Sequence, residues 1–517
     1  MDYMNETPSR KQNRLRRLRL VLVLAIVAGL TPVFGQKVLN IAMRVDIANV
    51  DLHMTTNFDD RNPLLTVYEF LIGIDGNGAP APMLAEDWVW SDDGLTLTVN
   101  LRHGVMFHNG NEMTSEDVKY SLDRVRTEGP RSSEFGQVTD IAVFDPYTID
   151  IVLSEPTGAL LGALANPIAP AVMIPAGEAE RQGGAITEPI GTGPFQFGEW
   201  LPDQYLRVDK FADYALDEDP ASGFTGRHEA LVDEIYFRPI PEATVRAAAL
   251  ENGEVQVAQA VAYPDYLRLQ DSSDVTVSMI PSATFGDVRF GFKQGAFAND
   301  LNLRLAVAMV TNKDELVEAL TWGQGRPAHS GLPFFSPYAV GIHQTPEPYG
   351  IEEARALVEA SDYDGSEILI SYTPGIWQEM GVIMQAQMAE IGINSRIDSL
   401  EAGSSLQKWQ TGAFDIFVTG LSLRPDPMNY YMPFWHSEST TTGYNNPEYD
   451  RLNEEALAAT DVAVRTELYE EIEELRRADM PWYPLIHTTE TMGYSNDISG
   501  FEPWSAGYFL LWNVDVP

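Results

Sequence analysis

The sequence predicts an α/β protein, and two observations about the order of its elements carry that prediction. Beyond about residue 290, helical patterns alternate with short apolar runs of strand length, which is typical of a lobe built on a largely parallel sheet. Before that point, short strand-like segments come in pairs joined by turn residues, which is typical of hairpins. The chain has 517 residues, enough for about three ordinary domains and a large core.

The expected elements follow from periodicity and turn residues. In the first half we expect a strand over 38–45, an irregular stretch over 51–63, a helix over 64–72, hairpins over 88–101, 141–153 and 195–209, and a short helix over 243–253. In the second half we expect helices over 300–320, 351–360, 376–391, 403–411, 447–459 and 462–478, with strands over 367–372, 393–398 and 414–419.

The most informative segment runs over residues 107–125. Asn109-Gly110 supplies the backbone freedom that a tight turn needs. Thr114, with Asp117 three residues later, predicts a capping box that begins a helix. The apolar face of that helix consists of Val118, Leu122 and Val125. A strand end, a turn and a capped helix therefore follow one another within nineteen residues.

The amino-terminal residues predict export. Six basic residues precede an apolar run over 20–30, and small residues follow it, which is the order of a secretory signal peptide cleaved before Gln36. The run is too short for a helix that spans a bilayer of ~30 Å, although a retained anchor is the alternative. The chain has no cysteine, so disulfides, thiolate metal sites and a lipid-modified cysteine are excluded. We expect a soluble periplasmic protein.

The charge is strongly acidic. The net charge of the whole chain is −41 at pH 7, and removal of residues 1–35, which carry +4, brings it to −45. A surface of this charge repels nucleic acid and anionic lipids, so we expect neither as a partner. Solubility, or adaptation to a saline habitat, is the simplest interpretation of the acidity.

The sequence contains the beginnings of two enzyme motifs, and both motifs are incomplete. The segment 191–196 starts like a dinucleotide-binding loop but lacks the third glycine. Ser405 and Lys408 have the spacing of a penicillin-interacting nucleophile without its companion motifs. His103 and His108 are close in sequence but favour packing over metal binding, and His436 is the one histidine in a segment that we expect to form a site. We therefore expect no catalysis and no cofactor.

Several stretches together resemble the extracytoplasmic solute-binding proteins of the oligopeptide, dipeptide and nickel class, solute-binding family 5, which feed ABC importers. The opening signature over 107–125 resembles the hallmark of that class. The further matching stretches are Gly191-Thr192-Gly193-Pro194-Phe195, Val232-Asp233-Glu234-Ile235, the segment 249–255, Asn302-Leu303-Arg304 and Gly443-Tyr444-Asn445-Asn446-Pro447. Their order and spacing hold from about residue 38 to 503.

The resemblance implies a two-lobed periplasmic-binding-protein fold that closes on its ligand through a hinge of two crossing segments. The first lobe would consist of 36–59, 189–284 and 488–517, with an inserted subdomain over 60–188. The second lobe would span 285–487. The crossings would lie near 284–290 and 484–489.

The same resemblance implies where the ligand binds. The segments expected to face the cleft contribute Asp46, Asn166, Phe285, Tyr372, Trp377, Arg424, Asp426, Asn429 and Trp435. Among these, Trp377 and Trp435 would provide apolar walls for a small buried molecule.

At two places this sequence differs from the peptide-binding members that it resembles, and both differences concern the ligand. Peptide-binding members resembling this chain hold the peptide ammonium with an aspartate at the position that is Leu423 here. Dipeptide members place an arginine near the helix entry, where this chain reads Pro374-Gly375-Ile376-Trp377. Arg424 and Asp426 remain as charged candidates, so a sugar, an opine-like conjugate or another small polar molecule is expected in place of an ordinary dipeptide.

The sequence thus predicts the monomeric periplasmic binding component of an ABC importer, with a small-molecule ligand and an inner-membrane permease as partners. A metal or metallophore carrier of the nickel type is the first alternative, and a secreted hydrolase is the second.

Overall fold

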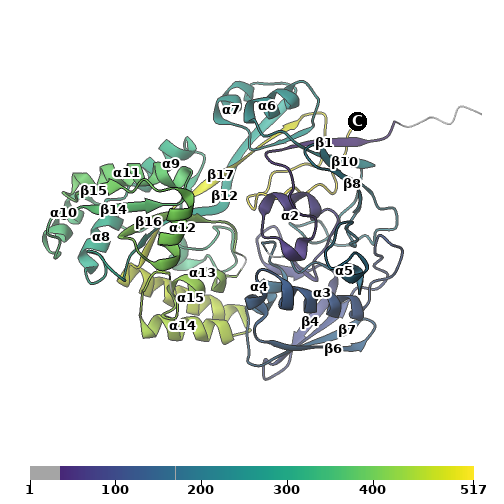
Figure 1. Ribbon diagram of the computed structural model, residues 1–517, viewed down its shortest axis with the longest axis horizontal. Coiled ribbons are helices and arrows are strands. Elements are labelled where there is room, and N and C mark those ends of the chain that lie inside the picture. The colour runs from purple at the N-terminus through teal and green to yellow at the C-terminus, as the bar shows by residue number, and fades with distance from the viewer. Residues whose placement is uncertain (1–34, 169, 425, 440) are drawn as a thin grey trace, which may run out of the picture. The chain divides into compact units, whose positions relative to one another are not determined.

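Two long strands, β12 (Val275–Phe290) and β17 (Trp482–Ser495), run antiparallel through the middle of the molecule. At one end β17 also pairs with β11 (Val257–Gln259), and at the other end β12 pairs with β16 (Ile416–Leu421). Helices α6 and α7 pack beside one end of this pair, and α9 packs beside the other (Figure 1). The register between the two strands shifts on both sides of Phe285. The irregularity lies where the sequence predicts the chain to cross between lobes.

The computed structural model describes residues 35–168, 170–424, 426–439 and 441–517, and residues 38–517 form one unit. The predicted signal peptide lies outside the described residues, apart from its last position. In the part of the chain that is described, no helix has both the length and the apolar character needed to cross a bilayer.

The described strands form one large sheet and two small ones. The large sheet has eleven strands in the order β15-β14-β16-β12-β17-β11-β1-β10-β9-β8, with β13 beside β17. Its remaining strands are β1 (Val38–Met43), β8 (Phe195–Leu201), β9 (Tyr205–Lys210), β10 (Glu234–Pro239), β13 (Arg326–Pro327), β14 (Ile368–Tyr372) and β15 (Ser395–Ile397). The pairs β14–β15 and β14–β16 are parallel, as the alternation of helices and strands predicts.

The helices of the second half follow the predicted order with two corrections. They are α8 (Leu301–Val310), α9 (Lys313–Thr321), α10 (Ile351–Glu359), α11 (Ile376–Glu390), α12 (Ala402–Thr411), α13 (Met428–Trp435), α14 (Pro447–Ala458) and α15 (Val462–Asp479). The single helix expected over 300–320 is wrong, because the Asn312 side chain accepts from the Glu315 amide and begins a second helix. Helix α13 was not expected, since Pro427 and Pro433 favour a loop reading.

The first half contains the predicted hairpins. The four-stranded sheet is ordered β4 (Ala85–Trp90), β5 (Thr96–Leu101), β7 (Thr148–Leu153) and β6 (Val138–Asp145), and β2 (Ile72–Ile74) pairs with β3 (Pro80–Pro82). The first-half helices are η1 (Leu52–Met54), α2 (Phe58–Leu64), α3 (Ser115–Glu128), η2 (Ser132–Phe135), α4 (Leu160–Leu164), α5 (Glu178–Arg181), α6 (Ala243–Glu251) and α7 (Tyr263–Leu269).

The predicted order of irregular and helical segments over 51–72 is wrong. Asn57 caps α2, which therefore begins at Phe58 inside the stretch expected to be irregular. Residues 64–72 are buried on every side, so their apolar run does not mark one face of a helix.

The signature over 107–125 folds as predicted. Thr114 and Asp117 form the capping box of α3, and Gly110 has a φ of 83° in its turn. His108 contacts the second matching stretch: its backbone N–H donates to the Gly191 carbonyl at 3.0 Å, and its Nε2 lies 3.0 Å from the Gly193 carbonyl. Two of the stretches that resemble the family, 107–125 and 191–195, are therefore packed together.

The buried apolar side chains form separate cores. The first core gathers residues from 39–257 and 492–516, and a small core under α6 and α7 adjoins β11. Two further cores take all their buried members from 285–486, and we call them together the second core. Leu423 is an exception, because it comes from the loop after β16 and packs in the first core.

Glu69 gives the fold a pH dependence. Burial raises its pKa to about 7, although the Tyr214 hydroxyl donates to it at 2.7 Å. The ring of His228 lies 3.9 Å away and stays neutral, because burial lowers the pKa of His228 to about 3. A raised pKa of a carboxyl favours the folded state fully below its ordinary value near 4.5, and this contribution is lost as pH rises through 7.

We therefore expect Glu69→Gln to be more stable than the parent at pH 8 by up to about 3 kcal/mol, and to lose that advantage at pH 4.5. The measurement is urea unfolding across this pH range, with Glu229→Gln, at a half-buried position near the surface, as a control. Parallel pH curves for Glu69→Gln and the parent would contradict the assignment.

Candidate functional site

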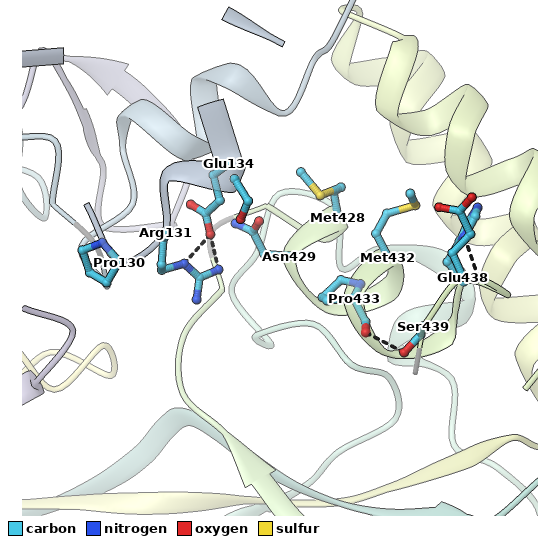
Figure 2. A pocket seen from close by; sticks show the side chains of 11 residues that line it. Pro130, Arg131, Glu134, Met428, Asn429, Met432, Pro433, Glu438 and Ser439 are labelled. Carbon is cyan, nitrogen blue, oxygen red and sulfur yellow. Dashed lines mark hydrogen bonds and ion pairs between the residues drawn. The ribbon is translucent and has the colours of Figure 1, made fainter. Parts of the chain in front are cut away.

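A pocket of about 570 Å³ lies between the segment around η2 and helix α13. Figure 2 shows Arg131, Glu134 and Asn429 close to one another, with Met432 and Ser439 farther along the same pocket. The lining residues are Pro130, Arg131, Ser133, Glu134, Met428, Asn429, Met432, Pro433, His436, Glu438 and Ser439. The pocket therefore joins a segment beside the first core to a helix of the second core, and its volume suits a small molecule.

Asn166 holds the first-core side of this pocket in place. Its Nδ2 donates to Glu134 Oε2 at 2.9 Å, and its Oδ1 accepts from the Ile168 amide at 2.9 Å. Glu134 also forms an ion pair with Arg131. Asn166 is fully buried, so in this conformation it orients Glu134 and does not itself line the pocket.

Arg424 lies in the loop that follows β16, and no described residue provides its guanidinium with a counter-ion. Nε and Nη1 are both buried without a hydrogen-bond partner, and no ion pair of Arg424 occurs within the described ranges. Burial, together with the charges of Arg131, Arg61 and Arg289 and against the opposing charge of Glu134, lowers the pKa of Arg424 to about 10. Several positive charges therefore converge beside the pocket.

Asp426 forms an internal ion pair. Its two carboxylate oxygens accept from Arg465 at 2.7 and 2.8 Å, and the carboxylate is buried. Arg465 also donates to the Tyr338 and Tyr469 hydroxyls at 2.9 Å and to the Gly158 carbonyl at 3.2 Å. In this conformation Arg465 occupies both oxygens of Asp426, and a contact of Asp426 with ligand stays a prediction.

Residues 79–442 match the family described as bacterial extracellular solute-binding proteins, family 5. The chain belongs to this family. Proteins of the family are the solute-binding components of ABC importers. The fold and the function that the sequence resemblance implied are thereby confirmed at the level of the family.

Among the relatives of this solute-binding protein is a glutathione-binding protein of Shigella dysenteriae, 26% identical over 95% of this chain and 97% of the relative. A dipeptide-binding protein from Pseudoalteromonas, solved with Met-Leu, has a TM-score of 0.74, is 23% identical, and is aligned over 93% of this chain and 100% of its own. The protein AgaA of A. tumefaciens, solved with agropinic acid, has a TM-score of 0.73 and 22% identity over 93% of this chain and 99% of its own. These structures share the periplasmic-binding-protein fold.

The aromatic residues predicted as pocket walls have different placements in this solute-binding protein. Trp435 is fully buried and stacks on Trp482, with ring centres 5.9 Å apart. Phe285 is 1% exposed and packs edge-on against Tyr430. Both lie in the second core, where other aromatic rings cover their apolar area in this conformation. The predicted contact of Trp435 and Phe285 with a ligand stays a prediction.

Trp377 remains half-buried, and two paired glycines make room for its ring. Gly286 on β12 lies opposite Gly420 on β16, and a Cβ atom on either would collide with the Trp377 indole. Tyr372 is nearly buried at the end of β14, and its carbonyl accepts from the Ser405 hydroxyl. The Ser405 hydroxyl is thus used in a hydrogen bond at the end of β14. Lys408, the second residue of the nucleophile-like spacing, forms an ion pair with Asp398.

Asp46 lies at another place in the molecule. Its carboxylate accepts from its neighbour Ile47 at 2.9 Å and from the Asp203 amide at 2.6 Å. These contacts tie the end of β1 to the β8–β9 turn. Asp46 does not line the pocket in Figure 2, whereas Asn429 and His436 do.

The sequence reasoning missed the other charged residues of the site. Arg61, Arg289 and the neighbouring pair Arg131 and Glu134 lie in three separate segments, and no spacing in the sequence connects these segments. In the described residues, no group of three or more His, Asp or Glu side chains is arranged to hold a metal ion.

We expect Asp426→Asn to lower the free energy of unfolding by about 3–5 kcal/mol, because it leaves the Arg465 guanidinium buried without its counter-charge. Urea unfolding monitored by tryptophan fluorescence measures this loss. Asp46→Asn is the control, since Asp46 faces only backbone amides, and a loss no larger than that of the control would speak against the pair.

We expect Gly420→Ala to destabilise the protein by about 1–3 kcal/mol, because the added methyl group displaces the Trp377 ring. Gly403→Ala is a matched control, since nothing lies within 4 Å of its Cβ position in α12, and alanine there should stabilise by up to about 1 kcal/mol. Equal unfolding midpoints for the two variants would show that Trp377 does not depend on this glycine pair.

Proposed function

We propose that this protein captures a small polar organic solute in the periplasm and delivers it to an ABC permease by closing two lobes around it. The observation that carries the proposal is the pocket between η2 and α13, whose lining residues Arg131 and Glu134 interact electrostatically with Arg424. Two nitrogens of the Arg424 guanidinium are buried without a hydrogen-bond partner among the described residues. A buried, unpaired charge next to a pocket is typical of a binding site whose ligand completes the pairing. The role requires no nucleophile, general base or cofactor.

We propose the lobe boundaries that the sequence predicts: 36–59, 189–284 and 488–517 for the first lobe, 60–188 for its inserted subdomain, and 285–487 for the second lobe. The separation of the first core from the second core supports this division. The register shifts around Phe285 support a hinge at the crossings, because a bulged ladder bends more readily than a regular one.

The relatives indicate the kind of solute. One relative binds glutathione, and two neighbours of known structure were solved with Met-Leu and with agropinic acid, all of which are small polar organic molecules. Leu423, where peptide-binding members carry an aspartate, packs in the first core and offers no charge to an ammonium group. We therefore propose that ordinary di- and tripeptides bind weakly, and that peptide-like or opine-like conjugates bind better. A nickel-type metal chelate is the alternative ligand class.

The other partners follow from the charge and from the family. We propose that the mature protein is a monomer released by signal-peptide cleavage near Gln36, and that it meets an inner-membrane permease. A net charge of −45 after cleavage supports the absence of nucleic-acid partners.

Native mass spectrometry of the purified protein identifies a solute that stays trapped in closed lobes. Addition of that solute, or of a binding member from a panel of conjugates, should raise Tm and shrink the radius of gyration seen by small-angle scattering, because ligand shifts the population toward the closed form. A saturating ligand that raises Tm without changing the scattering profile would argue against lobe closure, and a panel without any binder would refute the proposed function.

A further inference from the structure

The inserted subdomain and the second lobe, with the boundaries proposed above, touch at the start of α4. The Gly158 amide donates to the Leu457 carbonyl at 2.8 Å, and the Gly158 carbonyl accepts from Arg465 Nη1 at 3.2 Å. In Figure 1, α4 lies beside α14 and α15. Because the two hydrogen bonds join different lobes, both of them break when the lobes move apart.

Two glycines allow the backbones to come this close. A Cβ atom at Gly158 would collide with the Ala459 carbonyl oxygen and would lie 3.0 Å from Arg465 Cδ. A Cβ atom at Gly162 would lie 2.5 Å from the Cβ atom of Asp426 and 3.0 Å from its Oδ2. All of these atoms belong to the proposed second lobe. Neither glycine has a positive φ, so the local backbone conformation does not call for glycine at either position.

Gly162 is also an unfavourable residue for the helix that contains it. It is the middle residue of α4, and glycine in the interior of a helix is less stable than alanine. Leu160, Ala163 and Leu164 of the same helix pack in the first core, whereas Gly162 faces Asp426 across the lobe boundary. The reason for a glycine here therefore lies in the contact between lobes and not in the helix.

The surface that receives α4 is held rigid by the ion pair of Asp426 with Arg465. Arg465 also donates to two tyrosine hydroxyls at 2.9 Å and to the Ala456 carbonyl at 3.0 Å. These partners all belong to the proposed second lobe, so the guanidinium is oriented before α4 arrives. The paired charges neutralise each other, and Gly158 adds one further acceptor to Nη1.

We propose that Gly158 and Gly162 are positioning residues for lobe closure, because they let α4 seat on the pair of Asp426 and Arg465. The inference rests on the proposed function and goes beyond it, since it assigns residues that act on every solute without touching one. Neither glycine is among the residues that line the pocket between η2 and α13. The apparent affinity falls with the fraction of protein able to close, so a weaker contact lowers the affinity for all solutes by one common factor.

Gly162→Ala tests the proposal sharply, because its two effects have opposite signs. In the protein without solute, alanine favours α4, and the midpoint of urea unfolding should stay equal or rise. In isothermal titration with glutathione, Met-Leu and agropinic acid, each solute that binds the parent should bind the variant about ten- to a hundredfold more weakly, which is the size of an overpacking penalty. Gly158→Ala should weaken the same solutes by a common factor. Gly403→Ala in α12, where nothing lies within 4 Å of the added Cβ atom, should leave every affinity unchanged.

The closed population can be measured directly, because the chain has no cysteine and two introduced cysteines can be labelled without background. Asp92 on the inserted subdomain and Glu467 on α15 are both exposed. Pulsed electron paramagnetic resonance between spin labels at Asp92→Cys and Glu467→Cys should show a short-distance population that grows with added solute. At the same solute concentration, this population should be smaller when Gly162→Ala is added.

The outcomes separate this inference from the proposed function. Affinities equal to those of the parent, losses that differ from one solute to another, or an unfolding midpoint that falls together with the affinity would overturn the role of the glycines while the proposed function stands. If none of the three solutes binds and the label distance never changes, the proposed function is refuted, and the inference with it.

Discussion

The antiparallel pairing of β12 with β17 is the constraint on which the rest of the molecule depends. These two strands belong to the same sheet as strands from both halves of the chain, and they carry the side chains of both the first and second cores. The arrangement lets each side keep its own packed interior while the connection is confined to two extended segments. Because packed cores resist deformation more than a bulged strand pair does, we expect motion to concentrate at the bulges around Phe285.

That constraint also places the charged residues. Asp287 and Arg289 lie on β12 just beyond the bulge, and β16 beside it ends at Leu421, so that the following loop carries Arg424 toward the same region. The opposite side is supplied by η2 and by Asn166, which orients Glu134. The polar groups are thus fixed by strand ends and a buried amide, which hold side chains more rigidly than free loops do.

The turns, caps and helices that depend on residues close together in the chain were predicted well from the sequence. The capping box at Thr114, the hairpin turns and the helices from α10 to α15 follow from residues close in the chain, apart from α13, whose two prolines hid it. The site was predicted less well, because burial decides which candidates face a ligand. Trp435 and Asp426 have suitable chemistry and suitable positions along the chain, yet aromatic rings and Arg465 surround them in three dimensions. Arg424 was named from the sequence, whereas the charges that surround it come from distant segments and have no signal in the sequence.

The contrast between an acidic exterior and a cationic site has a physical consequence for an anionic solute. The overall charge opposes the approach of an anion at low ionic strength, while the site attracts it only at short range. Salt screens exposed charges beyond about 10 Å at 0.1 M and about 3 Å at 1 M, but it screens a buried ion pair much less. In a saline medium the repulsion at a distance therefore disappears and the attraction to Arg424 persists. An acidic surface and a group of positive charges near the pocket are compatible in one protein because the two act over different distances, and discrimination between solutes falls to the short-range contacts inside the pocket.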